Sequence, residues 1–125
     1  MKTRVLIVDD HGVFRDGLKA LINSQADMEV AGEAADGEKA LALTRELLPD
    51  IVLMDVKMPI MSGAEATRRI LAEMPGIKIL ALSIYAGGEF VADMTHAGAH
   101  GYVLKGCDSE ELFNIIRMTV GSPKT

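Results

Sequence analysis

Residues 51–59, with the sequence IVLMDVKMP, constrain the fold of this chain more than any other stretch. Ile51 to Met54 form an apolar run that is too short for a helix and has no polar alternation, which predicts a strand buried on both faces. Asp55 ends this run, and Pro59 cannot continue a central strand because it has no backbone N–H. The stretch therefore predicts a carboxylate at the carboxyl end of a buried strand, where open α/β sheets bind ligands. Taken alone, an aspartate in this place more often only ends a strand and caps the next segment.

Strand and helix patterns alternate along the rest of the chain. Short apolar runs predict strands at residues 5–8, 28–35, 51–54, 77–82 and 102–104. Acidic residues interrupt 28–35, as is typical of an edge strand. Apolar residues at helical spacing predict five helices through Phe14, Leu18, Leu21 and Ile22; Ala40, Leu43 and Leu47; Ala66, Ile70 and Met74; Phe90, Met94 and Ala97; Leu112, Ile115, Ile116 and Val120. The alternation predicts an α/β fold: a doubly wound, five-stranded parallel sheet with helices on both faces.

Three short motifs predict where helices begin. Asp36 is suited to cap the second helix, and Ser62 with Glu65 fits a capping box before the third. Asp108 with Glu111 opens the last helix in the same way. Pro75-Gly76 and Gly98 are typical helix stops.

Composition narrows the class of protein. A chain of 125 residues with 49% hydrophobic and 25% charged residues is one globular domain of ordinary make-up. Its net charge of −5 disfavours a general nucleic-acid surface. One cysteine, Cys107, excludes an internal disulfide framework, so a reducing cytoplasm is the simplest compartment. No apolar run approaches the roughly 18 residues of a membrane span, so no membrane contact is expected.

Five polar residues end or follow four different apolar runs: Asp9, Asp10, Asp55, Ser83 and Lys105. In a parallel sheet with right-handed crossovers these strand ends share one edge. Clustered carboxylates repel one another, so the pKa of at least one should rise unless a cation is present, and Mg²⁺ is the cation that suits hard oxygen ligands. A lysine and a hydroxyl beside them suit an anion that arrives with the metal. Each residue alone is more often a solvated turn, a surface lysine or a strand-end hydroxyl; their joint placement favours a site.

Together these residues resemble the receiver domain of two-component response regulators. The matching features are Asp9-Asp10, Asp55, Met58-Pro59, Gly63, Ser83 and Lys105, in order and in context. The resemblance implies a flavodoxin-like sheet with strand order 2-1-3-4-5 and Asp55 as the phosphoryl acceptor. It also implies that Asp9, Asp10, Asp55 and the backbone carbonyl of Lys57 hold Mg²⁺, that Ser83 and Lys105 bind phosphoryl oxygens, and that Tyr102 is the switch aromatic that follows the Ser83 hydroxyl.

Finer stretches resemble the NarL/FixJ (LuxR-type) subfamily: DDH at 9–11, EATRR at 65–69 and GAHGY at 98–102. This resemblance implies a receiver at residues 1–120 and, at 121–125, the start of a linker to a helix-turn-helix DNA-binding domain absent from this chain. A stand-alone receiver is the alternative. The partners implied are a sensor histidine kinase and, on phosphorylation, a second copy of the chain. Gly106 departs from the proline that many other receivers carry after the lysine, which predicts a looser loop there.

The chemistry expected is signalling rather than enzymatic turnover, although such a domain catalyses its own phosphoryl transfer and autodephosphorylation. Lys57 and Tyr85 would flank the path of a hydrolytic water, and Ala86-Gly87-Gly88 predicts a flexible loop. Phosphorylation would draw Ser83 inward, turn Tyr102 from outward to inward and change the face built by the fourth helix, fifth strand and fifth helix.

Two other classes compete. A haloacid dehalogenase-type phosphatase needs a second aspartate two residues after the nucleophile, where this chain has Lys57. A nucleotide- or flavin-binding module needs a glycine- or hydroxyl-rich loop after the first strand, where this chain has Asp9-Asp10-His11. His11 is expected to play a surface or supporting role rather than to bind metal, and nothing marks Cys107 as an activated thiol.

Overall fold

The computed structural model describes residues 2–84 and 88–121. Within these residues the chain alternates five strands and five helices. The strands are β1 (Thr3–Val8), β2 (Met28–Ala34), β3 (Ile51–Asp55), β4 (Lys78–Ser83) and β5 (Gly101–Leu104). The helices are α1 (Gly12–Asn23), α2 (Gly37–Leu47), α3 (Gly63–Glu73), α4 (Glu89–His96) and α5 (Ser109–Val120).

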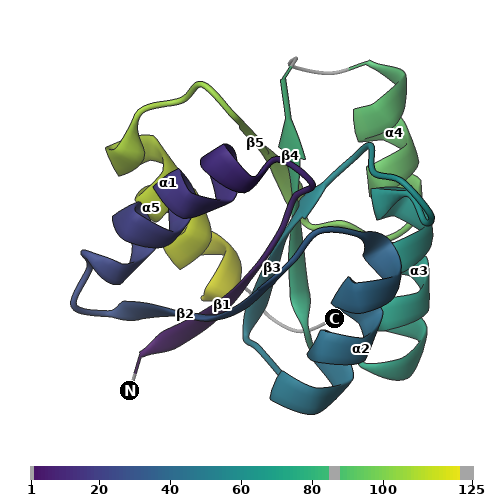
Figure 1. Ribbon diagram of the computed structural model, residues 1–125, viewed down its shortest axis with the longest axis horizontal. Coiled ribbons are helices and arrows are strands. Elements are labelled where there is room, and N and C mark those ends of the chain that lie inside the picture. Colours follow the sequence, from purple (N-terminus) through teal and green to yellow (C-terminus); the bar gives the residue numbers. More distant parts are fainter. Residues whose placement is uncertain (1, 85–87, 122–125) are drawn as a thin grey trace.

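The strands form one parallel sheet in the order β2-β1-β3-β4-β5. Helices α1 and α5 cover one face, and α2, α3 and α4 cover the other (Figure 1). The predicted fold class, strand order and edge position of β2 are therefore confirmed. Because all strands run the same way, their carboxyl ends meet at one edge.

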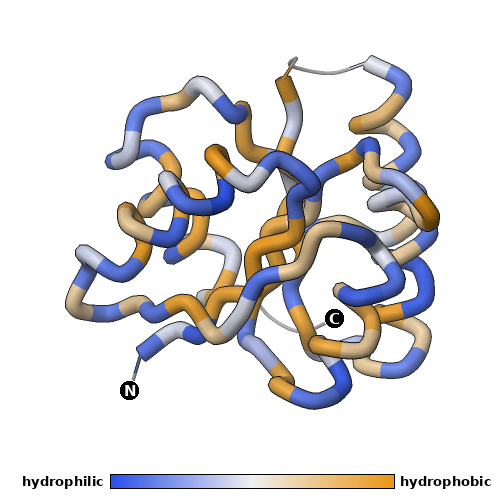
Figure 2. The backbone as a smooth tube through the Cα atoms, viewed as in Figure 1, coloured by the Kyte–Doolittle hydropathy of each residue, from blue (hydrophilic) through white to orange (hydrophobic). Residues whose placement is uncertain are grey.

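Two hydrophobic layers, one on each face of the sheet, form the core. Along β1, Val5 and Ile7 enter the layer under α1 and α5, while Leu6 and Val8 enter the layer under α2, α3 and α4. This is the two-residue period of a strand that is covered on both faces. The hydrophobic stretches in Figure 2 follow the central strands accordingly. The central strands are thus fixed from both sides, which makes their ends a rigid platform.

Helix boundaries follow the predicted capping residues. The side chains of Asp36, Ser62 and Asp108 each accept a hydrogen bond from the backbone N–H three residues further along the chain. Gly98 lies just after α4 with φ +110°, a left-handed conformation that favours glycine and ends the helix. The predicted start and stop signals are confirmed at these positions.

Some boundaries and faces differ from the sequence patterns. Strand β4 begins at Lys78 and includes Ser83, one residue later than predicted at each end. Leu21 and Phe90, expected on buried helical faces, are 39% and 50% exposed. Leu21 lies at the rim of a cavity beside α1, and Phe90 lies in the first turn of α4 with its ring near Lys57. Among the described helices, none has the length and apolar character needed to cross a membrane.

Candidate functional site

The backbone of Asp55 is fixed by the start of α3. Asp55 is the last residue of β3 and is 4% exposed. After the loop of residues 56–62, Gly63 packs directly on it: a Cβ at Gly63 would collide with the carbonyl oxygen of Asp55. The Gly63 N–H donates to the Val56 carbonyl at 3.3 Å. A glycine is therefore required here by close approach of two backbones, which holds the carboxylate at the sheet edge.

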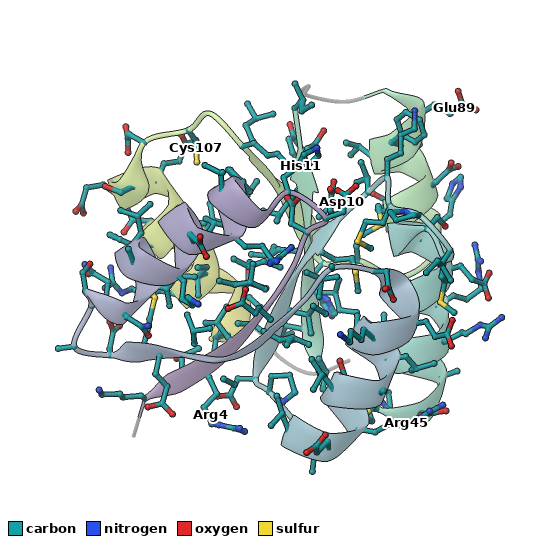
Figure 3. The ribbon with its side chains drawn as sticks, viewed as in Figure 1. Arg4, Asp10, His11, Arg45, Glu89 and Cys107 are labelled. Atoms are coloured by element: carbon teal, nitrogen blue, oxygen red, sulfur yellow. The ribbon has the colours of Figure 1, made fainter. Side chains whose placement is uncertain are left out.

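Asp9 and Asp10 follow β1 and face Asp55. Asp9 is fully buried, whereas the side chain of Asp10 is 32% exposed. Single oxygens of these three carboxylates, together with one ring nitrogen of His11, all lie within 4.8 Å of one another. The labelled side chains of Asp10 and His11 lie close together at this edge in Figure 3. The strand-end carboxylates predicted to converge do so.

Lys105, directly after β5, reaches the carboxylates from the edge of the sheet. Its Nζ lies 2.7 Å from Asp9 Oδ2 and 3.3 Å from Asp55 Oδ2. The same ammonium lies 4.9 Å from the centre of the Phe14 ring, close enough for a cation–π contact. One lysine therefore compensates two buried carboxylates.

The pKa values of the two buried aspartates move in opposite directions. Burial and the negative charge of Asp9 raise the pKa of Asp55 to about 6, and Lys105 only partly opposes them. Burial also acts to raise the pKa of Asp9, but hydrogen bonds from Lys105 and His11 outweigh it and hold that pKa below its usual value. Burial acts to lower the pKa of Lys105, yet the two aspartates raise it. The expected rise in the pKa of one carboxyl group is confirmed, and it falls on Asp55.

The acidic group fits a divalent cation. The buried Oδ2 of Asp9 faces the Lys105 ammonium at 2.7 Å. Asp9, Asp10 and Asp55 each offer a carboxylate oxygen to this group, and one ammonium is the cation that the described side chains place against the two buried carboxylates. Such a set of hard oxygen ligands matches what Mg²⁺ uses in proteins.

Ser83 and Tyr102 belong to the neighbouring strands β4 and β5. Ser83 is 5% exposed, and its carbonyl accepts a hydrogen bond from the Lys105 N–H at 2.8 Å. A cavity of about 290 Å³ includes Asp55, Ser83 and Lys105 in its lining. Tyr102, 40% exposed, lies outward on the edge strand. The structure brings Ser83 to the carboxylates and leaves Tyr102 apart from them.

Lys57 lines the same cavity as Asp55, Ser83 and Lys105. Its ammonium is 5.8 Å from the centre of the Phe90 ring, in the first turn of α4. The backbone N–H of Lys57 hydrogen-bonds to the Asp55 carboxylate and acts to lower its pKa. An amine in this place cannot serve as the general acid of a haloacid dehalogenase-type phosphatase.

Three neighbours of the site were not anticipated. Arg15 donates to the Asp9 carbonyl at 2.5 Å and to Glu33 at 3.0 Å, which ties α1 and β2 to the end of β1. Phe14 and Phe90 each support a lysine through their rings. Both phenylalanines occur at helical spacing, which predicts burial rather than contact with a lysine, and no sequence signal links Arg15 to a distant strand.

Other candidate residues lie away from the chemistry. Burial raises the pKa of the Cys107 thiol, as expected for an unactivated cysteine. Cys107 lines a second cavity, of about 690 Å³, between α1 and α5. That cavity is larger but mostly apolar, so the smaller one at Asp55 is the candidate reaction site. Tyr85 and residues 86–87 of the predicted flexible loop lie outside the described residues.

Comparison with known proteins agrees with this geometry. A family model described as "Response regulator receiver domain" matches residues 5–117. The transcriptional regulatory protein YxjL of Bacillus subtilis is 44% identical over 116 residues, covering 93% of this chain and 53% of the relative. The response regulator GacA of Pseudomonas aeruginosa is 43% identical over 114 residues, covering 91% of this chain and 53% of the relative. The chain thus spans about half the length of these curated relatives.

Solved structures show the same likeness. A LuxR-family two-component response regulator from Aurantimonas is 38% identical with a TM-score of 0.89, covering 96% of this chain and 86% of that one. The response regulator domain of Thermotoga maritima CheB is 32% identical with a TM-score of 0.90, covering 98% and 99%. The chain therefore belongs to the response regulator receiver domain family, in its LuxR/NarL-type branch, whose members are phosphoacceptor switches of two-component signalling.

Proposed function

We propose that Asp55 is the phosphoryl acceptor of this receiver domain. The observation that carries the assignment is a buried carboxylate at the end of the central strand, with a raised pKa, beside a lysine and two further aspartates. Among the described carboxyl groups whose pKa shift is resolved, Asp55 is the one whose pKa is raised. A strongly perturbed group with specific charged partners in a cavity is a marker of a functional site. With a pKa of about 6, Asp55 is still mostly ionised at pH 7 and able to attack phosphorus.

The reaction transfers one phosphoryl group to Asp55 from a phosphohistidine or a small acyl phosphate. A carboxylate oxygen of Asp55 attacks phosphorus in line and forms an O–P bond. The bond from phosphorus to the donor nitrogen or oxygen breaks, and its electron pair leaves with the donor. A bound Mg²⁺, held by Asp9, Asp10, Asp55 and the Lys57 carbonyl, would supply charge neutralisation for the phosphoryl oxygens. Lys105 exchanges its carboxylate contacts for a phosphoryl oxygen, and the Ser83 hydroxyl donates to another.

The switch begins at Ser83. Movement of its hydroxyl toward the phosphoryl group vacates space beside β5, which Tyr102 enters by turning inward. The face formed by α4, β5 and α5 then changes, as a shift in an equilibrium that exists before phosphorylation. Water later hydrolyses the acyl phosphate to inorganic phosphate and the Asp55 carboxylate. The domain therefore takes a phosphoryl group from a donor and later releases it to water as inorganic phosphate.

The proposed partners follow from the relatives. Residues 1–120 form the receiver, and 121–125 begin a linker, of which 122–125 lie outside the described residues. The relatives are about twice as long, and YxjL is described as a transcriptional regulatory protein, which supports a DNA-binding output domain in the full-length protein. A sensor histidine kinase would phosphorylate the domain in the cytoplasm, and phosphorylation would favour a homodimer.

Mass measurement tests the acceptor. With acetyl phosphate and Mg²⁺, the intact protein should gain one phosphoryl group, and Asp55→Asn should gain none. Asp93→Asn, on the exposed surface of α4, is a matched control that should be labelled like the parent. Undiminished labelling of Asp55→Asn would place the acceptor elsewhere.

A further inference from the structure

Phe90 is a large apolar side chain that stays half exposed beside the candidate site. It lies one turn before Met94 on the same side of α4, yet Met94 is 1% exposed and Phe90 is 50% exposed. The Phe90 ring lines the same cavity of about 290 Å³ as Asp55 and Ser83. The first turn of α4 therefore presents an aromatic ring to the candidate reaction site.

Lys57 connects this ring with the proposed acceptor. Its backbone N–H hydrogen-bonds to the Asp55 carboxylate, which fixes its main chain beside the acceptor. Its side chain is exposed and lines the cavity, and the ammonium lies 5.8 Å from the centre of the Phe90 ring, within the range of a cation–π contact. Among the described residues, this ring is the one partner of the Lys57 ammonium. The backbone of Lys57 is thus held by Asp55 and its side chain by Phe90.

We propose that Phe90 is a positioning residue for autodephosphorylation: its ring holds the Lys57 side chain across the solvent side of the cavity and so limits the approach of water to phosphorylated Asp55. The inference rests on Asp55 being the acceptor, and it adds a residue of α4 to the control of the phosphoryl lifetime. Lys57 and Phe90 are both exposed and both line the cavity, so they stand where water enters.

The step that the pair slows is hydrolysis of the acyl phosphate. A water oxygen bonds to phosphorus, opposite the oxygen of Asp55. The bond from phosphorus to that oxygen breaks, and its electron pair stays on the Asp55 carboxylate. The protons of the water leave with inorganic phosphate and the solvent. Loss of the ring leaves the Lys57 side chain without its partner and opens the path of the water.

The rate at which the phosphorylated protein loses its phosphoryl group tests the proposal. The protein is labelled with acetyl phosphate and Mg²⁺, the donor is removed, and intact mass is followed with time. Phe90→Leu should lose the group about two- to fivefold faster than the parent, the factor that corresponds to one cation–π contact at an exposed site. Phe90→Tyr keeps the face of the ring and should behave like the parent. Val91→Ala, a matched apolar truncation at the next residue of α4, should also keep the parent rate.

A double-variant cycle separates positioning from a general effect on α4. Lys57→Met should also speed hydrolysis, and adding Phe90→Leu to it should change the rate no further, because the contact is already lost. An effect of Phe90 on the helix alone would add to that of Lys57→Met. Proton NMR of the unphosphorylated protein reports the contact directly. The ε-methylene protons of Lys57 should be shifted upfield by the ring in the parent and in Phe90→Tyr, but not in Phe90→Leu.

The outcomes distinguish this inference from the proposed function. A parent-like rate in Phe90→Leu, or additive effects of the two substitutions, would overturn the role of Phe90 and leave Asp55 as the acceptor. A parent protein that gains no phosphoryl group from acetyl phosphate would overturn the acceptor, and this inference with it.

Discussion

Lys105 shows how one side chain sets the properties of two others. Its ammonium lies nearer to Asp9 than to Asp55, at 2.7 Å and 3.3 Å, so the charge on Asp9 is the better compensated. Asp9 therefore remains an ordinary anion with a lowered pKa, whereas the pKa of Asp55 rises to about 6. The proposed acceptor is the less stabilised carboxylate, which leaves it available to react with phosphorus.

The raised pKa of Asp55 predicts a pH-dependent effect of its removal. Between the ordinary value of 3.8 and the folded value of about 6, the folded protein keeps a proton that the unfolded chain releases. Ionised Asp55 therefore destabilises the fold increasingly as pH rises through this window, by up to about 3 kcal/mol. Without divalent cations, Asp55→Asn should raise the free energy of unfolding by up to this amount at pH 8 and by much less at pH 4.5. Urea unfolding at the two pH values measures it, and an equal effect at both would contradict the assigned pKa.

Cation binding should offset the repulsion among the carboxylates and so stabilise the fold. Mg²⁺ at about 100 times its dissociation constant should stabilise the parent by roughly 2.7 kcal/mol, because it binds the folded state alone. Asp10→Asn should lose most of this gain, and Asp16→Asn, an exposed aspartate on α1, should keep it. Thermal melts with and without Mg²⁺ test the point. A parent melting temperature that does not change when Mg²⁺ is added would count against an acidic metal site.

The sequence allowed the strand-end residues to be predicted because each follows an apolar run and parallel strands align their ends. Asp9, Asp55 and Lys105 meet for that reason alone. The contacts that surround these three residues could not be predicted. Arg15 reaches Glu33 across two elements, and Phe90 is exposed because it stands in the first turn of α4 beside Lys57. Such contacts depend on side-chain conformation and on distances between elements, which leave no periodic signal.

At the scale of elements, the junction between β3 and α3 depends on one glycine. A methyl group at Gly63 would meet the backbone of Asp55, and backbone cannot move aside as a flexible side chain does. The sequence predicted the helix start at Ser62, and the structure adds the reason why the next residue has no side chain.

A pair of glycine substitutions separates close approach from helix propensity. Gly63→Ala should lower the free energy of unfolding by about 1–3 kcal/mol through overpacking and should reduce phosphoryl labelling, because the acceptor is displaced. Gly17 lies in α1 with nothing within 4 Å of an added Cβ. Gly17→Ala should therefore raise the free energy of unfolding by about 0.5–1 kcal/mol, because alanine favours the helix more than glycine does. Chemical denaturation of both variants measures the two changes in the free energy of unfolding. Equal effects of the two substitutions would show that the Gly63 contact is unimportant.

At the scale of the whole molecule, the candidate site and the proposed signalling face of α4, β5 and α5 share the edge formed by β4 and β5. Ser83 ends β4 beside the carboxylates, and Tyr102 lies on β5, which pairs with β4. The face of α4, β5 and α5 also joins the two helical layers, since α4 covers one side of the sheet and α5 the other (Figure 1). A change at this edge therefore reaches both layers.

Ser83→Ala should separate phosphorylation from signalling. The fold should survive, because the substitution leaves no charge unpaired, and Asp55 should still accept phosphate since Lys105 remains. NMR shifts around Tyr102, with and without beryllofluoride as a stand-in for the phosphoryl group, should change less than in the parent. Lys105→Ala should impair both steps, because a full charge is lost in a partly dry site. Parent-like shift changes at Tyr102 in Ser83→Ala would mean that the signal leaves by another route.

The position of β5 has a mechanical consequence. Among the described strands, β5 is short, at four residues, and is bonded on one side only, to β4. Strand β3, which ends in the proposed acceptor Asp55, is instead held between two neighbours and covered on both faces. Displacing β5 breaks one set of ladder hydrogen bonds, whereas displacing β3 breaks two and opens both hydrophobic layers. The molecule thus combines a stiff centre, where the proposed acceptor lies, with an edge strand that fewer hydrogen bonds hold in place.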